Sequence, residues 1–405
     1  MKNKKYFLFL FSVLSVAVFS FLTSSCADDP SSLGLKFIPP GETTGVRIFD
    51  SFVDTMLITS TNKLKRVNTS TSVNMMVGIN GTYNSKALLK FNNITPDYDS
   101  AVVNSAKLTL KYRNYYYPPT HSDSLGQTAF DIYKVLQQHD YTKITYDSIN
   151  SSSIGTVSQG NYTGFLTADS QEVSITLNTS MVKDWLEYAA DTNWANKNYG
   201  IALSPGGASN VIKAFYAATT ASGLKPNLQV IVTKNNKTDT LNLSDAQSVS
   251  LVDGSPSAGS ESFSTQSGIG YVQVLKFDLS HIPRTATIND AQIYLTIDSS
   301  HCLFSSQTSF NISAGYISDT AVGTNTSLPV FSSTISGSQQ VIRVVRYLAS
   351  SPFQMWLDGQ TNNGFEIYNA GLYSNLDLFA FFNINASNPA KRPRVIIKYT
   401  PRITP

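Results

Sequence analysis

The sequence is poor in the residues that most metal and hydrolase sites require. Its 405 residues include only two cysteines and four histidines. Cys26 and Cys302 are too few for a disulfide framework or a cysteine-rich metal site. The histidines lie far apart in turn-like sequence, at His121, His139, His281 and His301. No His-Glu-x-x-His, Gly-x-Ser-x-Gly or phosphate-loop motif occurs, so we expect no enzyme activity and no cofactor.

Charge is also scarce. Charged residues make up 14% of the chain, against about 25% in an average soluble protein. Ser, Thr and Asn carry the polar share instead, which suits twisted sheets and turns. Three of the 30 basic residues lie in the first 25 positions; without them 27 basic residues balance 27 acidic ones. This balance does not support the basic surface that nucleic-acid binding requires, so we expect no nucleic-acid partner.

The N-terminal segment has the layout of a secretory signal. Lys2–Lys5 is basic, Tyr6–Leu22 carries no charge, and small residues then lead to Cys26. This layout resembles a bacterial lipobox, in which the cysteine is lipidated and the anchor holds the protein to the outer membrane. The alternatives are an ordinary signal peptide or an uncleaved anchor. We therefore predict a signal over residues 1–25 and a flexible tether over residues 26–45.

Two acidic residues follow the cysteine directly. Asp28 and Asp29 at this position resemble the surface-export signal of lipoproteins from Bacteroidota. The alternative is a solvated part of the tether. The resemblance implies a cell-envelope protein that is exposed on the cell surface.

Short runs of alternating polarity dominate the rest of the chain. In Ala106–Tyr112 every second residue is apolar, and Ala291–Asp298 repeats the pattern. A period of two is typical of a strand with one buried face. Many such strands at short spacing predict an all-β protein built from β-sandwiches of the jelly-roll type.

The chain contains an internal repeat. Motifs of the first half recur in the same order in the second half, at offsets of 186, 171 and 167 residues. The matched pairs are Leu88–Phe91 with Val274–Phe277, Val103–Ala106 with Ile288–Ala291, Trp185–Leu186 with Trp356–Leu357, Asn198–Ile201 with Asn363–Phe365, and Lys225–Ile231 with Arg392–Ile397. We predict two tandem sandwiches, over residues 46–235 and 236–405, with one short helix each.

These motifs resemble the DNRLRE-type domain of secreted bacterial proteins. That family combines a Lys/Arg-Phe strand end, a Pro turn, an Ala-x-Leu-x-Leu strand, a Trp-bearing helix and an Arg-Pro-x-Leu-x-Val strand. The resemblance covers about residues 46–233 and 246–400. The first copy departs from it at Lys225, where Arg is usual. The resemblance implies a β-sandwich related to carbohydrate-binding modules.

Aromatic residues are the ligand candidates, because sugar faces pack on flat rings. Tyr115, Tyr116 and Tyr117 are consecutive, so a strand cannot turn all three rings inward. The alternative is core packing together with a protein-contact surface. Trp194 has no counterpart in the second copy and is the fourth candidate. Trp185 and Trp356 recur, so we predict that both are core residues.

Other reactive groups are weaker candidates. Asp97 and Asp99 share one turn and could give two oxygens to calcium, although a plain turn is the simpler interpretation. We expect no other metal site. His281 is predicted to be an exposed turn residue and Cys302 a buried small hydrophobe.

These features together predict a non-catalytic, lipid-anchored envelope protein that binds glycan or another surface polymer. A structural or adhesive protein with a protein partner is the alternative. A polysaccharide-degrading enzyme, with its acid and base brought together only by folding, is a weaker one. The ligand and the oligomeric state are left open by the sequence.

Overall fold

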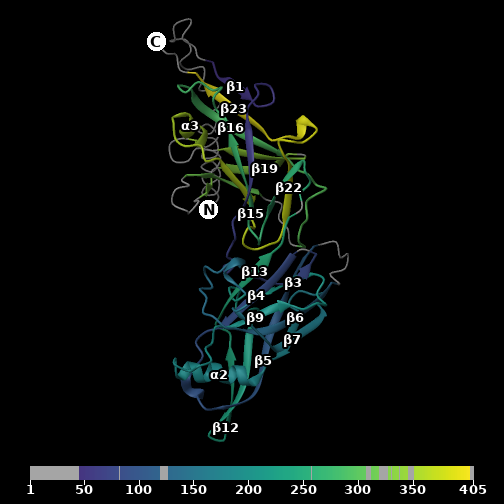
Figure 1. Ribbon diagram of the computed structural model, residues 1–405, viewed down its shortest axis with the longest axis vertical. Coiled ribbons are helices and arrows are strands. Elements are labelled where there is room, and N and C mark those ends of the chain that lie inside the picture. The colour runs from purple at the N-terminus through teal and green to yellow at the C-terminus, as the bar shows by residue number, and fades with distance from the viewer. Residues whose placement is uncertain are drawn as a thin grey trace, which may run out of the picture.

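The computed structural model describes residues 45–81, 83–118, 126–256, 258–306, 312–318, 327–329, 331–336, 338–344 and 351–401. It is an all-β protein of the sandwich type, as predicted, with antiparallel sheets stacked into two units along one long axis (Figure 1). The predicted signal, the tether and Cys26 lie outside the described residues.

The first unit contains eleven strands among the described residues. They are β3 (Asn74–Asn80), β4 (Tyr83–Phe91), β5 (Val102–Tyr117), β6 (Gln127–Val135), β7 (Ile154–Phe165), β8 (Glu172–Thr176), β9 (Ile201–Pro205), β10 (Ile212–Tyr216), β11 (Asn227–Lys234), β12 (Lys237–Leu243) and β13 (Ala246–Asp253). Its helices are α2 (Thr179–Ala190) and the 3-10 turns η2 (Pro96–Tyr98) and η3 (Tyr146–Ser148).

The second unit repeats this order. Its strands are β14 (Ser262–Gln266), β15 (Tyr271–Phe277), β16 (Thr287–Thr296), β17 (Ile312–Ile317), β18 (Ser327–Pro329), β19 (Phe331–Ser336), β20 (Gln339–Val344), β21 (Phe365–Asn369), β22 (Leu378–Phe382) and β23 (Arg394–Thr400). Its helices are α3 (Pro352–Leu357) and the 3-10 turn η4 (Pro389–Lys391). Two further strands, β1 (Arg47–Asp50) and β2 (Ile58–Leu64), complete it.

The predicted core positions are confirmed. On β5 the apolar residues Ala106, Leu108, Leu110 and Tyr112 are fully buried, and on β16 Ala291, Ile293 and Leu295 are buried. The two recurring tryptophans, Trp185 on α2 and Trp356 on α3, are 2% and 8% exposed. Helix α2 begins after Asn178, whose side chain accepts a hydrogen bond from the Ser180 N–H at 3.0 Å. Each helix therefore presents its tryptophan to the core of its own sandwich.

Strand pairing differs from the predicted division at residue 235. β1 pairs with β23 and β2 with β15, so the first two strands of the chain belong to the second unit, one in each of its sheets. β12 pairs with β11 and β13 with β4, so the two strands after residue 236 belong to the first unit. β1 and β12 occupy matching places, because Phe49 pairs with Ile397 where Leu241 pairs with Val230. The two N-terminal strands thus complete the second sandwich and not the first, which follows them directly in the sequence.

One ion pair helps to explain this choice of partner. The guanidinium of Arg394 on β23 donates from both Nε and Nη2 to the carboxylate of Asp50 on β1. In the repeat alignment Arg394 matches Asn227 on β11, which carries no charge. β1 therefore meets a bidentate partner for Asp50 on β23, whereas the matching position of β11 offers no charge. An isolated sequence pattern does not reveal such a preference, because both units offer the same strand edge.

The Asp50–Arg394 pair should make stability depend on pH. The Arg394 hydrogen bonds hold the pKa of Asp50 below its usual range. Because the pKa is lower in the folded chain than in the unfolded chain, the pair stabilises the fold above about pH 4. That contribution should be lost as the pH falls through the lowered pKa. We expect Asp50→Asn to flatten the acid limb of the stability curve, measured by urea unfolding between pH 2 and 6; an unchanged slope would contradict this.

A small apolar core joins the two units. Met76, Tyr83, Tyr115 and Tyr117 of the first unit pack with Ile269 and Leu376 of the second. The rings of Tyr83 and Tyr117 meet edge to face at 5.4 Å. Hydrogen bonds cross the same boundary: the Tyr83 hydroxyl donates to Gln266 Oε1 at 3.0 Å, and the Leu376 N–H donates to the Tyr115 hydroxyl at 2.8 Å. Apolar packing and directed hydrogen bonds together fix how the units meet.

Candidate ligand-binding groove

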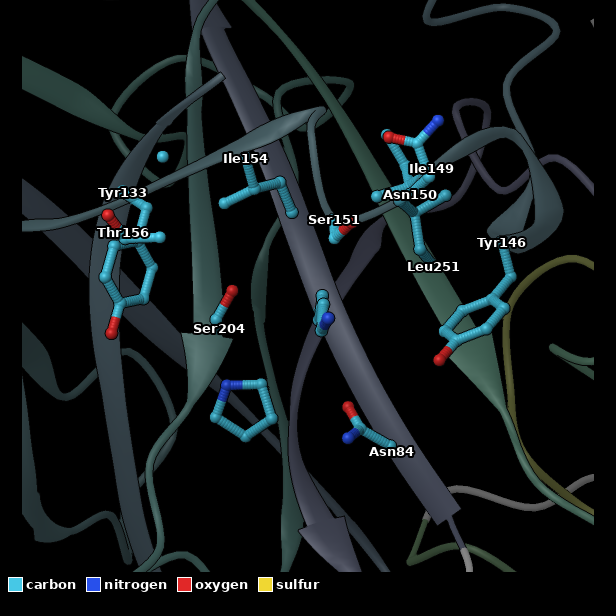
Figure 2. A pocket seen from close by; sticks show the side chains of 13 residues that line it. Asn84, Tyr133, Tyr146, Ile149, Asn150, Ser151, Ile154, Thr156, Ser204 and Leu251 are labelled. Carbon is cyan, nitrogen blue, oxygen red and sulfur yellow. The ribbon is translucent and has the colours of Figure 1, made fainter. Parts of the chain in front are cut away.

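A groove of about 700 Å³ opens on the outer face of the first sandwich. Its size falls within the usual range of ligand sites, about 300–1,000 Å³. Tyr133 and Tyr146 stand on opposite sides of it, with Asn84 and Ser204 between them (Figure 2). The other lining residues are Lys86, Ile149, Asn150, Ser151, Ile154, Gly155, Thr156, Pro205 and Leu251.

Strand alternation places these side chains. On β4 the residues Ala87, Leu89 and Phe91 enter the main core, so Asn84 and Lys86 lie on the opposite face. On β6 Phe130 and Ile132 point inward, which turns Tyr133 outward. The segment between β6 and β7 covers part of this outer face through Tyr141 and Ile144, which pack on Leu88. The groove lies beside that cover, where the sheet face is left open.

Arg66 positions one of the two tyrosines. Its guanidinium lies 5.2 Å from the ring centre of Tyr146. The same group donates to Asp147 at 3.0 Å and to Asp253 at 2.9 Å. These contacts tie η3, which carries Tyr146, to the end of β13. Burial raises the pKa of the Tyr146 hydroxyl, so this group remains a hydrogen-bond donor at neutral pH.

The floor of the groove is polar but not acidic. The Asn84 Oδ1 atom is buried and has no hydrogen-bond partner among the described residues. Such an orphaned acceptor is costly unless another group satisfies it. Lys86 supplies a positive charge, and none of the lining residues is a carboxylate. The groove therefore offers two rings, one cation and several amide and hydroxyl groups.

The second unit does not repeat this floor. At the offset of 186 residues, Asn84 corresponds to Gly270 and Lys86 to Val272. Val272 is fully buried, in a small cluster with Val67 and Leu372. The polar floor is therefore a property of the first unit, although the strands around it are duplicated.

The predicted tyrosine run is mostly buried. Tyr115 and Tyr117 are fully buried in the joint between the units, so neither ring is available to a ligand. The prediction that Tyr115 and Tyr117 bind a ligand is therefore wrong. The physical reason is that β5 extends beyond the first sandwich into the joint, where both rings become buried. Tyr116 is half-buried, and its backbone exchanges hydrogen bonds with Ser306 of the second unit at 3.0 Å. Tyr115, Tyr116 and Tyr117 therefore contribute to the contact between the two units and do not form an open sugar-binding site.

Trp194 lies apart from the groove. It is 39% exposed in the loop that follows α2. Its indole N–H points to Asp184 Oδ1 at 3.4 Å, and the Asn196 amide donates to the same oxygen at 3.1 Å. The fold does not bring Trp194 together with Tyr116, because α2 and the joint lie at opposite ends of the first unit (Figure 1).

The turn with Asp97 and Asp99 is held by protein groups. The Thr95 hydroxyl donates to Asp97 Oδ2 at 2.6 Å, and the Lys234 ammonium pairs with Asp99 at 2.7 Å. Within the described ranges no three His, Cys, Asp or Glu side chains gather as metal ligands. The turn interpretation therefore fits this site better than a calcium site. His281 is exposed in its turn, as predicted, and His121 lies outside the described residues.

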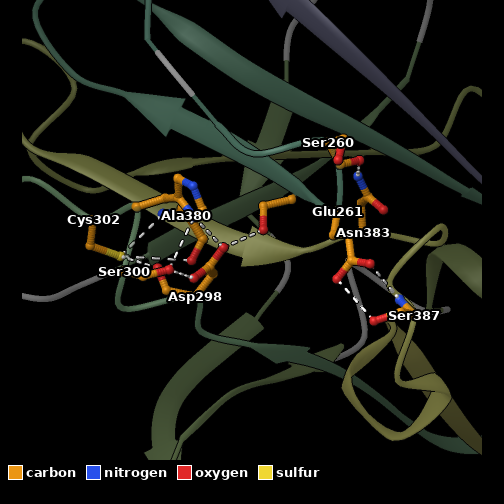
Figure 3. Close-up of polar contacts among 10 residues, drawn as sticks. Ser260, Glu261, Asp298, Ser300, Cys302, Ala380, Asn383 and Ser387 are labelled. Carbon is orange, nitrogen blue, oxygen red and sulfur yellow. Dashed lines mark hydrogen bonds and ion pairs between the residues drawn. The ribbon is translucent and has the colours of Figure 1, made fainter.

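Asp298, His301 and Cys302 form a second polar cluster (Figure 3). The Asp298 carboxylate contacts His301 Nδ1 at 2.7 Å and accepts hydrogen bonds from Ser262 and Ser300. A hydrolytic triad would need a nucleophile on the other imidazole nitrogen, whereas the Ser300 hydroxyl also meets Nδ1. Cys302 is part-buried; its thiol donates to the Asp298 carbonyl and accepts from the Ala380 N–H, both at 3.3 Å. Burial raises the pKa of this thiol, which makes it a poor nucleophile. The cluster therefore serves to hold the loop of Asp298–Cys302 against β22.

A sequence signal for the groove did exist. Within Gln127–Val135 the inward positions are Phe130 and Ile132, so Tyr133 is an aromatic on the solvent side of a strand. A ring on that side of the strand is one on which a sugar face could pack. Tyr146 gives no comparable signal, because it lies in a turn whose packing depends on Arg66, 80 positions earlier.

Comparison with known proteins does not place the chain in a family. No family model and no curated protein matches it. A solved structure of infectious bursal disease virus, Gx strain, aligns over 90% of this chain and 79% of that chain, with 9% identity and a TM-score of 0.12. No helix within the described ranges has the length and apolar character needed to span a bilayer.

Proposed function

We propose that the protein is a non-catalytic, lipid-anchored envelope protein whose first sandwich binds an acidic glycan in the Tyr133–Tyr146 groove. The observation that carries this proposal is the lining of the groove: two tyrosines face each other across a polar floor that holds one lysine and no carboxylate. Tyrosine rings pack on the C–H faces of sugars at a low entropic cost.

The charge of the lining selects the class of glycan. Lys86 would attract the carboxylate or sulfate of an acidic sugar, with no acidic neighbour in the groove to oppose it. The Ser151, Thr156 and Ser204 hydroxyls of the lining could exchange hydrogen bonds with sugar hydroxyls. Glycoside hydrolysis by the usual mechanism needs two carboxyl groups beside the bond that breaks. A groove without either supports binding rather than cleavage.

The cell-envelope location rests on the sequence alone. The charged start, the apolar run and Cys26 support lipidation, and Asp28–Asp29 supports display on the cell surface. The DNRLRE resemblance adds that such sandwiches are related to carbohydrate-binding modules.

Affinity gels that contain a polyuronate or a neutral glucan test the ligand. We expect the full-length protein to be retarded by the polyuronate and released by salt, because the lysine contributes a screened attraction. Tyr133→Ala and Lys86→Gln should each weaken retention about tenfold, which corresponds to about 1.4 kcal/mol. Retention by neither polymer, or equal retention by both, would reject the proposed ligand class.

Matched variants test the site. Thr156→Trp should block the groove, while Thr163→Trp should not, because Thr163 is an exposed residue of the same strand, β7, outside the lining. Trp194→Ala should leave retention unchanged. Loss of binding in Trp194→Ala with retention in Tyr133→Ala would move the site to the loop after α2.

A further inference from the structure

The end of the second sandwich carries an unusual amount of exposed apolar surface. Fourteen large hydrophobic side chains are exposed among the described residues, and five of them fall within residues 46–57. Their exposed fractions are 61% for Val46, 62% for Ile48, 42% for Phe52, 78% for Val53 and 65% for Leu57. A concentration of this kind marks an interaction surface more often than single exposed residues do.

The loop that bears these residues is held in place. The N–H groups of Val53 and Asp54 donate to the Asp50 carbonyl at 2.9 and 2.8 Å, and the Asp50 N–H donates to Asp54 Oδ2 at 2.7 Å. The Asp50 carboxylate in turn is fixed by Arg394. These contacts order the turn, so its apolar side chains remain exposed in the folded protein.

A shallow apolar hollow lies behind the loop. It has a volume of about 570 Å³, and Phe52, Met56, Leu57, Ile384 and Pro393 are among its lining residues. Basic residues lie close by: Arg392 lines the hollow, and Lys391 precedes it in η4. Apolar side chains with basic neighbours are the combination that favours the interface of a lipid bilayer.

The chain enters the folded protein beside this surface, so a lipid anchor at Cys26 would hold the surface near a membrane. Because β1 closes the second unit, the chain enters the folded protein at Val46, beside the loop and next to β23 at one end of the molecule (Figure 1). Cys26 lies 20 positions earlier, within a reach of about 70 Å for an extended chain. A lipid on Cys26 would therefore hold this end, rather than the end with α2 and β12, near the bilayer.

We propose that residues 46–57 form a membrane-contact surface that docks the second sandwich on the bilayer and leaves the groove on the other unit free for its ligand. This inference rests on the proposed lipid anchor at Cys26. Contact by the loop adds a second membrane attachment to the lipid, and two attachments hold a protein far more stably than one.

A fluorescent label at the loop tests the contact. The full chain, lipidated in its host, is purified in detergent and reconstituted into vesicles of phosphatidylethanolamine and phosphatidylglycerol. An NBD label is placed at Val53→Cys or, as the matched control, at Val157→Cys, both in a Cys302→Ser background. Val157 is an equally apolar residue, 69% exposed on β7 of the first unit. We expect the label at 53 to shift to shorter wavelength and to be quenched by doxyl lipids, and the label at 157 to show neither effect.

The other outcomes separate the two claims. Vesicle flotation reports the anchor: a chain that does not float rejects the lipid at Cys26 and this inference with it. A chain that floats, but whose label at 53 is not quenched, keeps the anchor and rejects the membrane contact. A blue shift at 53 without doxyl quenching would assign the surface to a protein segment instead, and equal quenching at 53 and 157 would reject a preferred orientation.

Discussion

Tyr115→Ala should destabilise the protein by about 3–5 kcal/mol, the usual cost of removing a large buried aromatic side chain. The ring is fully buried where the two units meet. Its hydroxyl also accepts the hydrogen bond from the Leu376 N–H across the boundary. The change removes packing and leaves that N–H without its acceptor, so the two units should lose their coupling. Urea unfolding followed by tryptophan fluorescence and by circular dichroism measures both effects.

Two neighbouring variants act as controls. Tyr115→Phe keeps the packing and removes only the acceptor, so its cost should be about 1–3 kcal/mol. Tyr116→Ala, at the half-buried neighbour, should cost much less than Tyr115→Ala. We expect Tyr115→Ala to split one transition into two, because each sandwich keeps its own core. A loss below about 1 kcal/mol with a single transition would contradict the assigned joint.

Gly270→Ala should be the second severe change. Gly270 has a φ of +97°, and a Cβ atom built there would lie 1.8 Å from the Lys65 carbonyl oxygen. The Lys65 N–H also donates to the Gly270 carbonyl at 2.8 Å, where β2 ends against β15. A methyl group would force β2 away from β15, so we expect a loss of at least about 3 kcal/mol from strain and lost packing. Hydrogen exchange should show the amides of β2 opening first.

Gly359→Ala separates backbone strain from the clash. Gly359 has a similar φ of +102°, but a Cβ atom built there would have no other atom within 4 Å. Its cost should be about 1–2 kcal/mol, the penalty of the left-handed conformation alone. Equal losses in Gly270→Ala and Gly359→Ala would show that the close approach of Lys65 to β15 does not exist in solution.

Local pattern predicted the parts of the fold that depend on local chemistry. Alternation in Ala106–Tyr112 predicted the buried face of β5, and the recurrence of Trp185 predicted the core residue of α2. The buried face of a strand or helix follows from the period of its side chains, so it can be predicted from residues that are close in the sequence. The recurrence of the same motifs in the same order predicted two sandwiches.

Long-range pairing was not predictable in the same way. The two sandwiches present alike edges, and the ion pair that favours β23 as the partner of β1 joins residues 344 positions apart. The prediction for Tyr115 and Tyr117 was wrong because alternation indicates on which face of the strand a ring lies. It does not indicate that β5 continues into the joint between the two units. The groove depends on how the segment around Tyr146 folds over the sheet, through Arg66.

The pairing of the N-terminal strand β1 with β23 of the second unit is the claim on which the orientation at the membrane depends, and disulfide trapping measures it directly. Ile48 pairs with Lys398 in β23, and the matching position on β11 of the first unit is Ile231. Paired Cα atoms of antiparallel strands lie about 4.5–5.5 Å apart, which suits a disulfide. In a Cys302→Ser background, Ile48→Cys with Lys398→Cys should oxidise within one chain, and Ile48→Cys with Ile231→Cys should remain reduced. The reverse result would place β1 on the first sandwich and contradict the account.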